Sequence, residues 1–303
     1  MTAPAPGEHG GDGARLAAIL GIEPGDVLDL SATLNPCAPD VAALAGGHLD
    51  SLGRYPDDRE ATVALAADLG VDADRVVLTN GGSEAIALVA AELGAGWVEA
   101  PDFSLYERHL PRLDRSAGRW RSNPRNPTGE LAGPGERAAV WDEAFYPLAT
   151  GAWTSGAADD GAVVVGSLTK LFACPGLRAG YVIAPDTAFA DALRRRRPAW
   201  SVGGLACALV PELLSLADLP GWAKAIAEGR ETLVGSLEAA GWRVYAADAP
   251  WVLVDHAGPL RERLAEQAIL VRDCASFGLH DTVRIAVPSE EGLSRLRRSL
   301  RSR

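Results

Sequence analysis

Four polar side chains gather just after the apolar run at 162–166: Ser167, Thr169, Lys170 and Arg178. The run predicts a buried strand, and the carboxyl ends of strands are where α/β folds bind their ligands. A lysine at such a place can form an imine with a carbonyl cofactor, and the hydroxyl and guanidinium groups beside it can hold a phosphate. An ordinary loop lysine is the alternative, and Lys170 alone would favour it.

The elements that must position these groups alternate along the middle of the chain. Residues 26–31 and 75–80 are short apolar runs that predict strands, whereas 57–69 and 81–93 have helical spacing. Further apolar runs alternate with helical segments up to about residue 185. This alternation predicts an α/β fold with a mostly parallel sheet covered by helices.

Beyond residue 200 the pattern changes. A long helical stretch covers about 203–240, and the strands and helices after it are fewer and more mixed. This change predicts a second, smaller α+β domain. We expect a large domain at 48–215, and a small domain built from both ends of the chain, 1–47 and 216–303.

Composition excludes several classes of protein. The 303 residues carry a formal net charge of −11, so a nucleic-acid partner has little electrostatic support, and the basic run 194–197 indicates a solvated helix face. The four cysteines form no C-x-x-C pair, which argues against disulfides or zinc and suits a reducing cytosol. No apolar run is long enough to span a membrane, and residues 1–15 lack the features of a signal peptide. We therefore expect a cytoplasmic globular protein without a metal site.

The lysine segment resembles the lysine motif of the class I and II aminotransferases, in which an arginine eight residues after the lysine binds the phosphate of pyridoxal phosphate (PLP). Lys170 and Arg178 have this offset. The resemblance implies that Lys170 forms the Schiff base with PLP, and that Ser167, Thr169 and Arg178 help to bind the cofactor. It also implies fold type I of the PLP-dependent transferases, an α/β fold whose large domain has a mostly parallel sheet of the seven-stranded type beside a small α+β domain.

Two further segments follow the family's order. Asn80-Gly-Gly-Ser stands at a strand-to-helix turn, where free backbone N–H groups and the helix dipole favour a phosphate, and by resemblance Gly82 and Ser83 supply those contacts. Ala100-Pro-Asp-Phe matches the place where the family stacks an aromatic ring on the pyridine of PLP, so Phe103 is the candidate. Each of these segments alone would be weak support.

The next two segments are more specific. Asn123-Pro-Arg-Asn-Pro-Thr-Gly resembles the family's N-P-x-N-P-T-G, which implies that Asn126 hydrogen-bonds the phenolic oxygen of PLP. Trp141-Asp-Glu-Ala-Phe resembles the family's D-E-A-Y. Asp142 would then pair with the pyridine nitrogen and keep it protonated, which makes the ring an electron sink for a carbanion. Lys170 and Asp142 are therefore the expected catalytic residues.

Two positions imply a partner subunit and a substrate contact. Arg54-Tyr-Pro-Asp resembles a segment whose tyrosine reaches the cofactor phosphate of the neighbouring subunit, so Tyr55 implies a homodimer. Thr282-Val-Arg resembles the C-terminal strand whose arginine grips the substrate carboxylate, and Arg284 suits such a bidentate contact. A surface strand arginine is the alternative interpretation of Arg284.

The sequence also departs from the family. The tyrosine of D-E-A-Y is Phe145 here, which removes one hydroxyl near the cofactor without abolishing the electron sink. The spacing between Phe103, Asn126 and Asp142 is short, so we expect the large domain to have lost peripheral elements around 108–140.

The reaction stays open between two groups of relatives. His9-Gly-Gly-Asp, Asp29-Leu-Ser-Ala-Thr-Leu-Asn-Pro and Phe145 look most like threonine-phosphate decarboxylases of cobalamin biosynthesis, whereas histidinol-phosphate aminotransferases share all the cofactor motifs. Both act on a phosphorylated amino acid or amine, so we expect a substrate-phosphate site that includes His9 and one or more arginines. A non-catalytic PLP-binding protein is the alternative of another class, and the intact set of cofactor residues opposes it.

Overall fold

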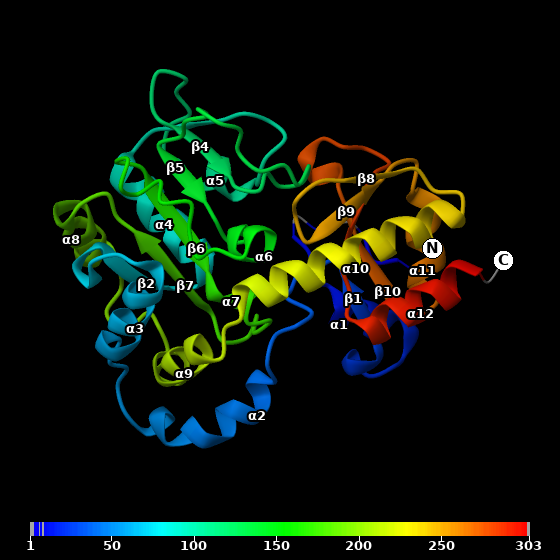
Figure 1. Cartoon of the computed structure of the whole chain (residues 1–303), viewed down its shortest axis with the longest axis horizontal. Helices are drawn as coiled ribbons and strands as arrows, with labels where there is room; N and C mark the ends of the chain where they lie inside the picture. The colour runs from blue at the N-terminus through cyan, green and yellow to red at the C-terminus, as the bar shows by residue number, and fades with distance from the viewer. Residues whose placement is uncertain (1–2, 6, 8, 302–303) are drawn as a thin grey trace.

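The computed structural model describes residues 3–5, 7 and 9–301, and it contains two β-sheets with helices packed around them (Figure 1). The strands of the larger sheet are, in spatial order, β2 (Val76–Asn80), β7 (Ala179–Ile183), β6 (Val163–Ser167), β5 (Val140–Asp142), β4 (Arg119–Ser122) and β3 (Trp97–Val98). The strands from β6 to β3 are parallel, whereas β7 is antiparallel to both of its neighbours. The predicted α/β fold with a mostly parallel sheet is confirmed.

The larger sheet has six strands in the described residues, one fewer than the seven-stranded type implied by the sequence. Between β3 and β4 the chain forms the short helix α5 (Leu105–His109) and a single parallel bridge from Gly96 to Leu113, which leaves no room for a further full strand. The segment 123–139 between β4 and β5 contains no helix. The loss of peripheral elements around 108–140 stays a prediction.

Both faces of the larger sheet are buried, because successive residues of its strands point to opposite sides. On β6, Val163 and Val165 belong to one apolar cluster and Val164 to another. The helices of the first cluster are α4 (Gly81–Leu93), α5 and α8 (Thr187–Arg196). The second cluster includes residues of α3 (Arg59–Leu69), α6 (Tyr146–Thr150), α7 (Leu168–Leu171), α9 (Gly204–Ser215) and α10 (Leu219–Ala239), and it continues into the part of the chain that forms the smaller sheet.

The smaller sheet joins the two ends of the chain. Its strands are, in spatial order, β1 (Leu28–Leu30), β10 (Ile269–Asp273), β11 (Val283–Ala286), β9 (Trp251–Val254) and β8 (Val244–Ala246), with β1 parallel to β10 and the rest antiparallel. Helices α1 (Gly13–Leu20), α11 (Gly258–Ala265) and α12 (Glu290–Arg301) lie around it (Figure 1). Helix α10 runs between the two halves and contacts both α6 and β8. Each sheet lies within one of the two parts that we propose as domains, 48–215 and 1–47 with 216–303.

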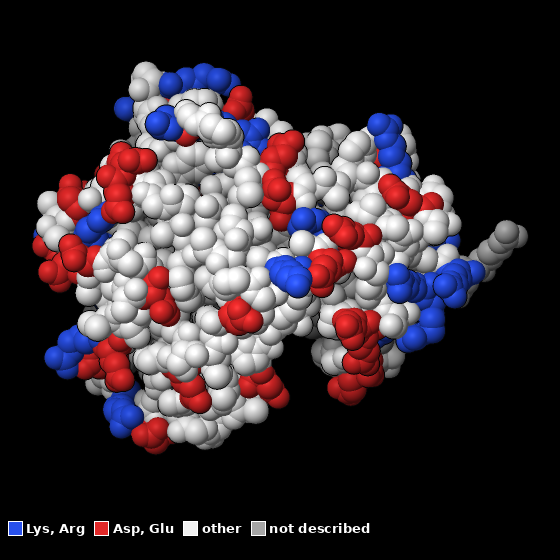
Figure 2. Space-filling model, viewed as in Figure 1, with Lys and Arg blue, Asp and Glu red and all other residues white. Residues whose placement is uncertain are grey.

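The helical stretch predicted at about 203–240 is in fact two helices, α9 and α10, which meet at an angle of 83°. The break occurs where Asp218 caps α10, accepting the N–H of Gly221 at 3.0 Å, and where Pro220 occupies the first turn. No single described helix is long and apolar enough to cross a membrane, although α9 and α10 together meet that test of length and composition. On the face shown in Figure 2, acidic and basic side chains are interspersed.

Candidate active site

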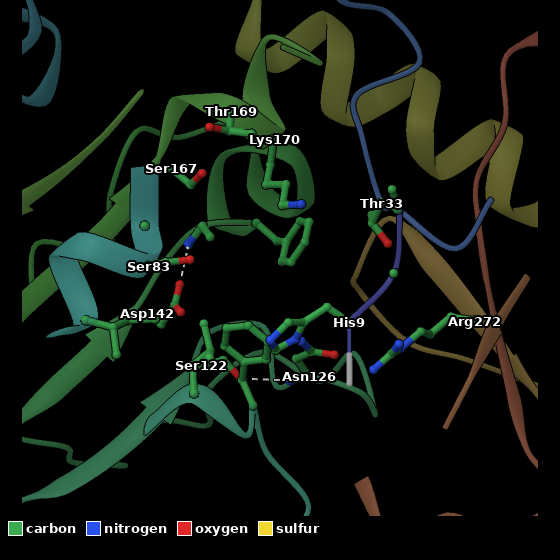
Figure 3. Close-up of a pocket in the computed structure, with 18 of the residues that line it drawn as sticks. His9, Thr33, Ser83, Ser122, Asn126, Asp142, Ser167, Thr169, Lys170 and Arg272 are labelled. Atoms are coloured by element: carbon green, nitrogen blue, oxygen red, sulfur yellow. Dashed lines mark hydrogen bonds between the residues drawn. The ribbon is translucent and has the colours of Figure 1, made fainter. Parts of the chain in front are cut away.

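A cavity of about 270 Å³ lies between residues of both sheets. Every predicted site residue except Tyr55 lines it. Figure 3 shows Lys170 and Thr169 on one side, Ser83, Ser167 and Asp142 on the next, Asn126 below, and His9 opposite Ser83. The predicted residues that line the cavity are His9, Gly82, Ser83, Phe103, Asn126, Asp142, Ser167, Thr169, Lys170, Arg178 and Arg284. Side chains about 275 residues apart in the sequence therefore meet at one place.

Lys170 enters the cavity from α7, the short helix that follows β6. The turn is braced by Asn35, whose N–H donates to the Lys170 carbonyl at 3.1 Å and whose amide donates to the Leu171 carbonyl at 2.9 Å. Desolvation, together with the nearby Arg284 and Arg178, lowers the pKa of Lys170 from 10.5 to about 8. A neutral amine is a nucleophile, so near pH 8 this lysine is suited to attack a carbonyl.

Asp142 stands at the end of β5 and faces the same cavity. Its carboxylate accepts the hydroxyl of Tyr106 at 2.9 Å and the N–H of Ala144 at 3.0 Å. Desolvation raises the pKa of Asp142, whereas those two hydrogen bonds and Lys170 lower it. A cationic partner in the cavity would stabilise the charged carboxylate directly.

The start of α4 forms a cradle suited to an anion. Gly81 has a φ of +74°, and a Cβ at this position would collide with the guanidinium of Arg178. The Glu84 carboxylate accepts the N–H of Asn80 at 2.6 Å, which closes the first turn and leaves Gly82 and Ser83 facing the cavity. Backbone N–H groups, hydroxyls and a guanidinium therefore converge where a phosphate would lie.

The opposite wall is built on the turn after β4. The N–H of Asn126 donates to Ser122 Oγ at 2.8 Å, and the Ser122 hydroxyl donates to the buried carboxylate of Asp102. Arg284 reaches this wall from β11, and its Nη1 donates to Asn126 Oδ1 at 2.5 Å. Arg284 is only 6% exposed, and desolvation lowers its pKa to about 10. The alternative of a surface strand arginine is therefore wrong.

Several residues of the site were missed by sequence reasoning. Tyr106 stands three residues after Phe103 at the start of α5, and the two rings pack edge to face with centroids 5.7 Å apart. That spacing was a usable indication, because residues three apart share a helix face. Thr33, Ser122 and Arg272 carried no such indication, because they come from loops and strands remote in sequence.

The N-terminal segment lies over the cavity. His9 packs its ring against Phe103 with centroids 5.8 Å apart. One side chain of β1 and one just after it bind the segment: Asp29 Oδ2 accepts the N–H of Gly13 at 3.0 Å, and Ser31 Oγ accepts the N–H of Gly11 at 2.9 Å. His9 therefore forms part of the cavity wall.

Tyr55 lies outside the cavity. Its side chain is 77% exposed, and its ring packs on Trp200 with centroids 4.6 Å apart. Within one chain Tyr55 therefore takes no part in this site, and its role at the site of a second subunit stays a prediction.

The residues of the cavity fit PLP. The cradle at Gly81 and Arg178 is suited to bind its phosphate. Lys170 is placed to react with its aldehyde, and Asp142 is placed to pair with its pyridine nitrogen. Two buried polar atoms, Thr33 Oγ1 and Arg284 Nε, have no hydrogen-bond partner among the described residues and are free to bind a ligand. Among the described residues, no group of three or more His, Cys, Asp or Glu side chains is placed to hold a metal ion.

The fold and these side chains define a PLP-dependent enzyme of fold type I. The model of the family "Aminotransferase class I and II" matches residues 120–300, more than half of the chain, and the chain belongs to this family. The resemblance seen in the sequence, the enzyme class and the cofactor are thereby confirmed.

Curated relatives fall into two groups. The chain is 30% identical to a threonine-phosphate decarboxylase of Salmonella typhimurium, with 97% of this chain and 96% of the relative covered. It is 26% identical to a histidinol-phosphate aminotransferase of Geobacillus sp., with 89% and 88% covered. The sequence motifs indicated these same two groups of relatives, the threonine-phosphate decarboxylases and the histidinol-phosphate aminotransferases.

Solved structures share the fold. The L-threonine-O-3-phosphate decarboxylase of Porphyromonas gingivalis is similar with a TM-score of 0.77 at 21% identity, with 91% of this chain and 98% of that chain covered. The histidinol-phosphate aminotransferase of Sinorhizobium meliloti, which was solved with pyridoxal-5'-phosphate, has a TM-score of 0.82 at 18% identity, with 95% and 94% covered.

Proposed function

We propose that the protein decarboxylates threonine phosphate or a closely related phosphorylated amino acid, as a step of cobalamin biosynthesis. The observation that carries this proposal is the 30% identity to a threonine-phosphate decarboxylase over nearly the full length of both chains. Transamination of histidinol phosphate is the second candidate, supported by relatives at 26% identity.

A group of polar side chains beyond the cofactor residues supports a phosphorylated substrate. Arg272 from β10, Thr33 and His9 lie together on the side of the cavity opposite Ser83 (Figure 3). Burial lowers the pKa of Arg272, yet this guanidinium stays charged at neutral pH. The Arg272 guanidinium donates to the Gly7 carbonyl at 2.8 Å and to Ser276 Oγ at 2.8 Å, which holds it at the cavity edge. The expected substrate-phosphate site would thus include Arg272.

The roles that we propose for the chain's own residues follow from their positions. PLP, when bound, supplies a sink for the electron pair left at the substrate Cα. Asp142 holds the pyridine nitrogen in its protonated form, and Phe103 packs on the ring. Arg284 grips the substrate carboxylate and so sets which bond at Cα stands perpendicular to the ring. After carbon dioxide leaves, the protonated ammonium form of Lys170, which is present at neutral pH, would donate the proton that replaces it at Cα.

We also propose a cytoplasmic homodimer. The side chains of Leu49, Leu52, Tyr55 and Trp200 are all more than half exposed, and Tyr55 contacts Trp200. Large exposed apolar side chains gathered in this way are typical of protein–protein interfaces. A second copy of the chain would cover them and bring Tyr55 to the neighbouring cofactor phosphate.

The two candidate reactions give different products. The PLP-loaded protein is incubated with threonine phosphate, and separately with histidinol phosphate and 2-oxoglutarate, with Lys170→Ala as the control. The proposal expects carbon dioxide and 1-amino-2-propanol phosphate in the first reaction. Glutamate from the second reaction without carbon dioxide from the first would favour the aminotransferase, and neither product from loaded protein would favour a non-catalytic role.

A further inference from the structure

Trp251 lies behind the site without lining the cavity. It begins β9 and is 1% exposed. In the antiparallel pair β9–β11 it stands opposite Ala286, so Arg284 is its diagonal neighbour on the same face of the sheet. Diagonal neighbours in a sheet are within reach of each other when one is aromatic and the other long.

The indole makes two contacts at once. The guanidinium carbon of Arg284 lies over the ring, 4.9 Å from its centroid. The indole Nε1–H donates to the carbonyl of Pro127 at 2.7 Å, within buried surroundings. Pro127 follows Asn126, whose side chain accepts Arg284 Nη1. One side chain of the small sheet thus fixes both partners of the Arg284–Asn126 hydrogen bond.

The surroundings hold the indole rigidly. Phe145 packs on it edge to face with centroids 4.9 Å apart. The N–H groups of Asp248 and Ala249 both donate to the Gly129 carbonyl at 3.1 Å, and Arg230 of α10 donates to the carbonyls of the same two residues. The residues just before Trp251 are therefore tied to the turn after β4 through Gly129 and to α10 through Arg230.

Arg284 needs such support because it is a buried cation without an anion. No carboxylate among the described residues pairs with it, and its Nε has no hydrogen-bond partner there. A buried charge is costly unless it is paired, so the ring face and the Asn126 carbonyl oxygen compensate for it only in part. The unpaired guanidinium is thus directed at an anionic group of the ligand.

We propose that Trp251 is a positioning residue that holds Arg284 in the orientation that binds a substrate carboxylate and links it to the turn that carries Asn126. The inference rests on the proposed function for the identity of the substrate. It adds a residue that touches neither the cofactor nor the substrate.

Two substitutions separate the two contacts. Trp251→Phe keeps a ring under the guanidinium and removes the N–H that Pro127 accepts, whereas Trp251→Leu removes both. Trp222→Phe is the matched control, because Trp222 is also buried but lies in the apolar cluster away from the cavity. We expect KM for threonine phosphate to rise on the order of 10-fold in Trp251→Phe and 100-fold in Trp251→Leu, with unchanged KM in the control.

The decarboxylated product, 1-amino-2-propanol phosphate, shows whether the effect concerns the carboxylate. It lacks the group that Arg284 binds, so its inhibition constant should stay within about twofold of wild type in both Trp251 variants. Parallel losses for substrate and product, or an unchanged KM in Trp251→Leu, would overturn the proposal.

Amide hydrogen exchange of the substrate-free holoenzyme tests the link without any reaction. Trp251→Phe should speed exchange in the turn 123–131, whereas Trp222→Phe should leave it unchanged. If the wild-type protein binds neither threonine phosphate nor 1-amino-2-propanol phosphate, the proposed function is wrong. Hydrogen exchange then decides by itself whether Trp251 links Arg284 to the turn that carries Asn126. Unchanged protection of the turn in Trp251→Leu would then contradict it.

Discussion

The chain has two lysines, Lys170 and Lys224, and their surroundings are opposite. The Lys224 side chain is 79% exposed on α10 and lies 4.0 Å from the Glu228 carboxylate, whereas Lys170 faces the cavity beside Asp142 and two arginines. Desolvation and the arginines favour the neutral amine at Lys170. The capacity for imine chemistry is therefore confined to one of the two side chains.

Borohydride reduction of the PLP-loaded protein should attach the cofactor to Lys170. Because only two lysines exist, peptide mapping by mass spectrometry gives an unambiguous answer. Lys170→Ala should lose the reducible link and keep the fold by circular dichroism, while Lys224→Ala should keep both. A reducible link that persists in Lys170→Ala would contradict the assignment of Lys170 as the Schiff-base lysine.

The low pKa of Lys170 also predicts how the cofactor-free protein responds to pH. The folded value is about 8, against 10.5 for the free side chain, so between these values the unfolded chain binds more protons than the folded one. The contribution of Lys170 to the free energy of unfolding should therefore rise with pH across this window, by on the order of 3 kcal/mol. Urea unfolding at pH 8 and pH 10 measures it, and Lys170→Met should remove this rise whereas Lys224→Met should not.

At the scale of elements, the sequence predicts best where local chemistry and packing agree. The structure has α4 at Gly81–Leu93, as predicted, because a glycine turn begins it and Gly94 ends it with a φ of +70°. The prediction of a solvated face for the basic run 194–197 holds for Arg195 and Arg196, which are exposed. Arg194 and Arg197 are instead half-buried: Arg194 donates to the carbonyls of Asp74 and Val76, and Arg197 donates to that of Leu78, which fastens the end of α8 to β2 and to the turn before it.

The two ends of α4 offer a matched test of the anion cradle. Gly81 and Gly94 both have positive φ, but a Cβ at Gly94 would meet no atom within 4 Å, whereas at Gly81 it would collide with Arg178. Both alanine variants should lose about 1 kcal/mol or more of stability from the left-handed backbone. Gly81→Ala alone should also weaken PLP binding, by on the order of 10-fold or more, because it displaces the guanidinium. Equal PLP affinity in the two variants, measured by fluorescence titration, would contradict the cradle.

At the scale of the molecule, the site depends on contacts that no single segment encodes. The motifs that identify Asn126, Asp142 and Lys170 are local, so the sequence could predict them. The Arg284–Asn126 hydrogen bond and the Trp251–Pro127 hydrogen bond join residues more than 120 positions apart, and only the folded arrangement of the two sheets brings them together. In the homodimer that we propose, the exposed Tyr55 would make the site depend on a second chain as well.

Assembly is the last prediction. A homodimer of twice 31.6 kDa should be seen by light scattering, with each cofactor phosphate completed by Tyr55 of the partner subunit. Tyr55→Phe should weaken PLP retention by about 1–2 kcal/mol, as expected for one hydrogen bond to a charged group. Tyr55→Glu should abolish retention, because a carboxylate would then face the phosphate, while Tyr245→Glu at another exposed tyrosine should have no effect.

Mixing two inactive variants tests the sharing of sites directly. A dimer of one Lys170→Ala subunit and one Tyr55→Glu subunit contains one site in which both residues are native. Refolding the two variants together should therefore recover part of the wild-type activity, up to about a quarter, because half of the dimers are hybrids with one working site each. An active monomer, or hybrids that form and yet stay inactive, would show that Tyr55 serves no neighbouring site and that its ring only packs on Trp200.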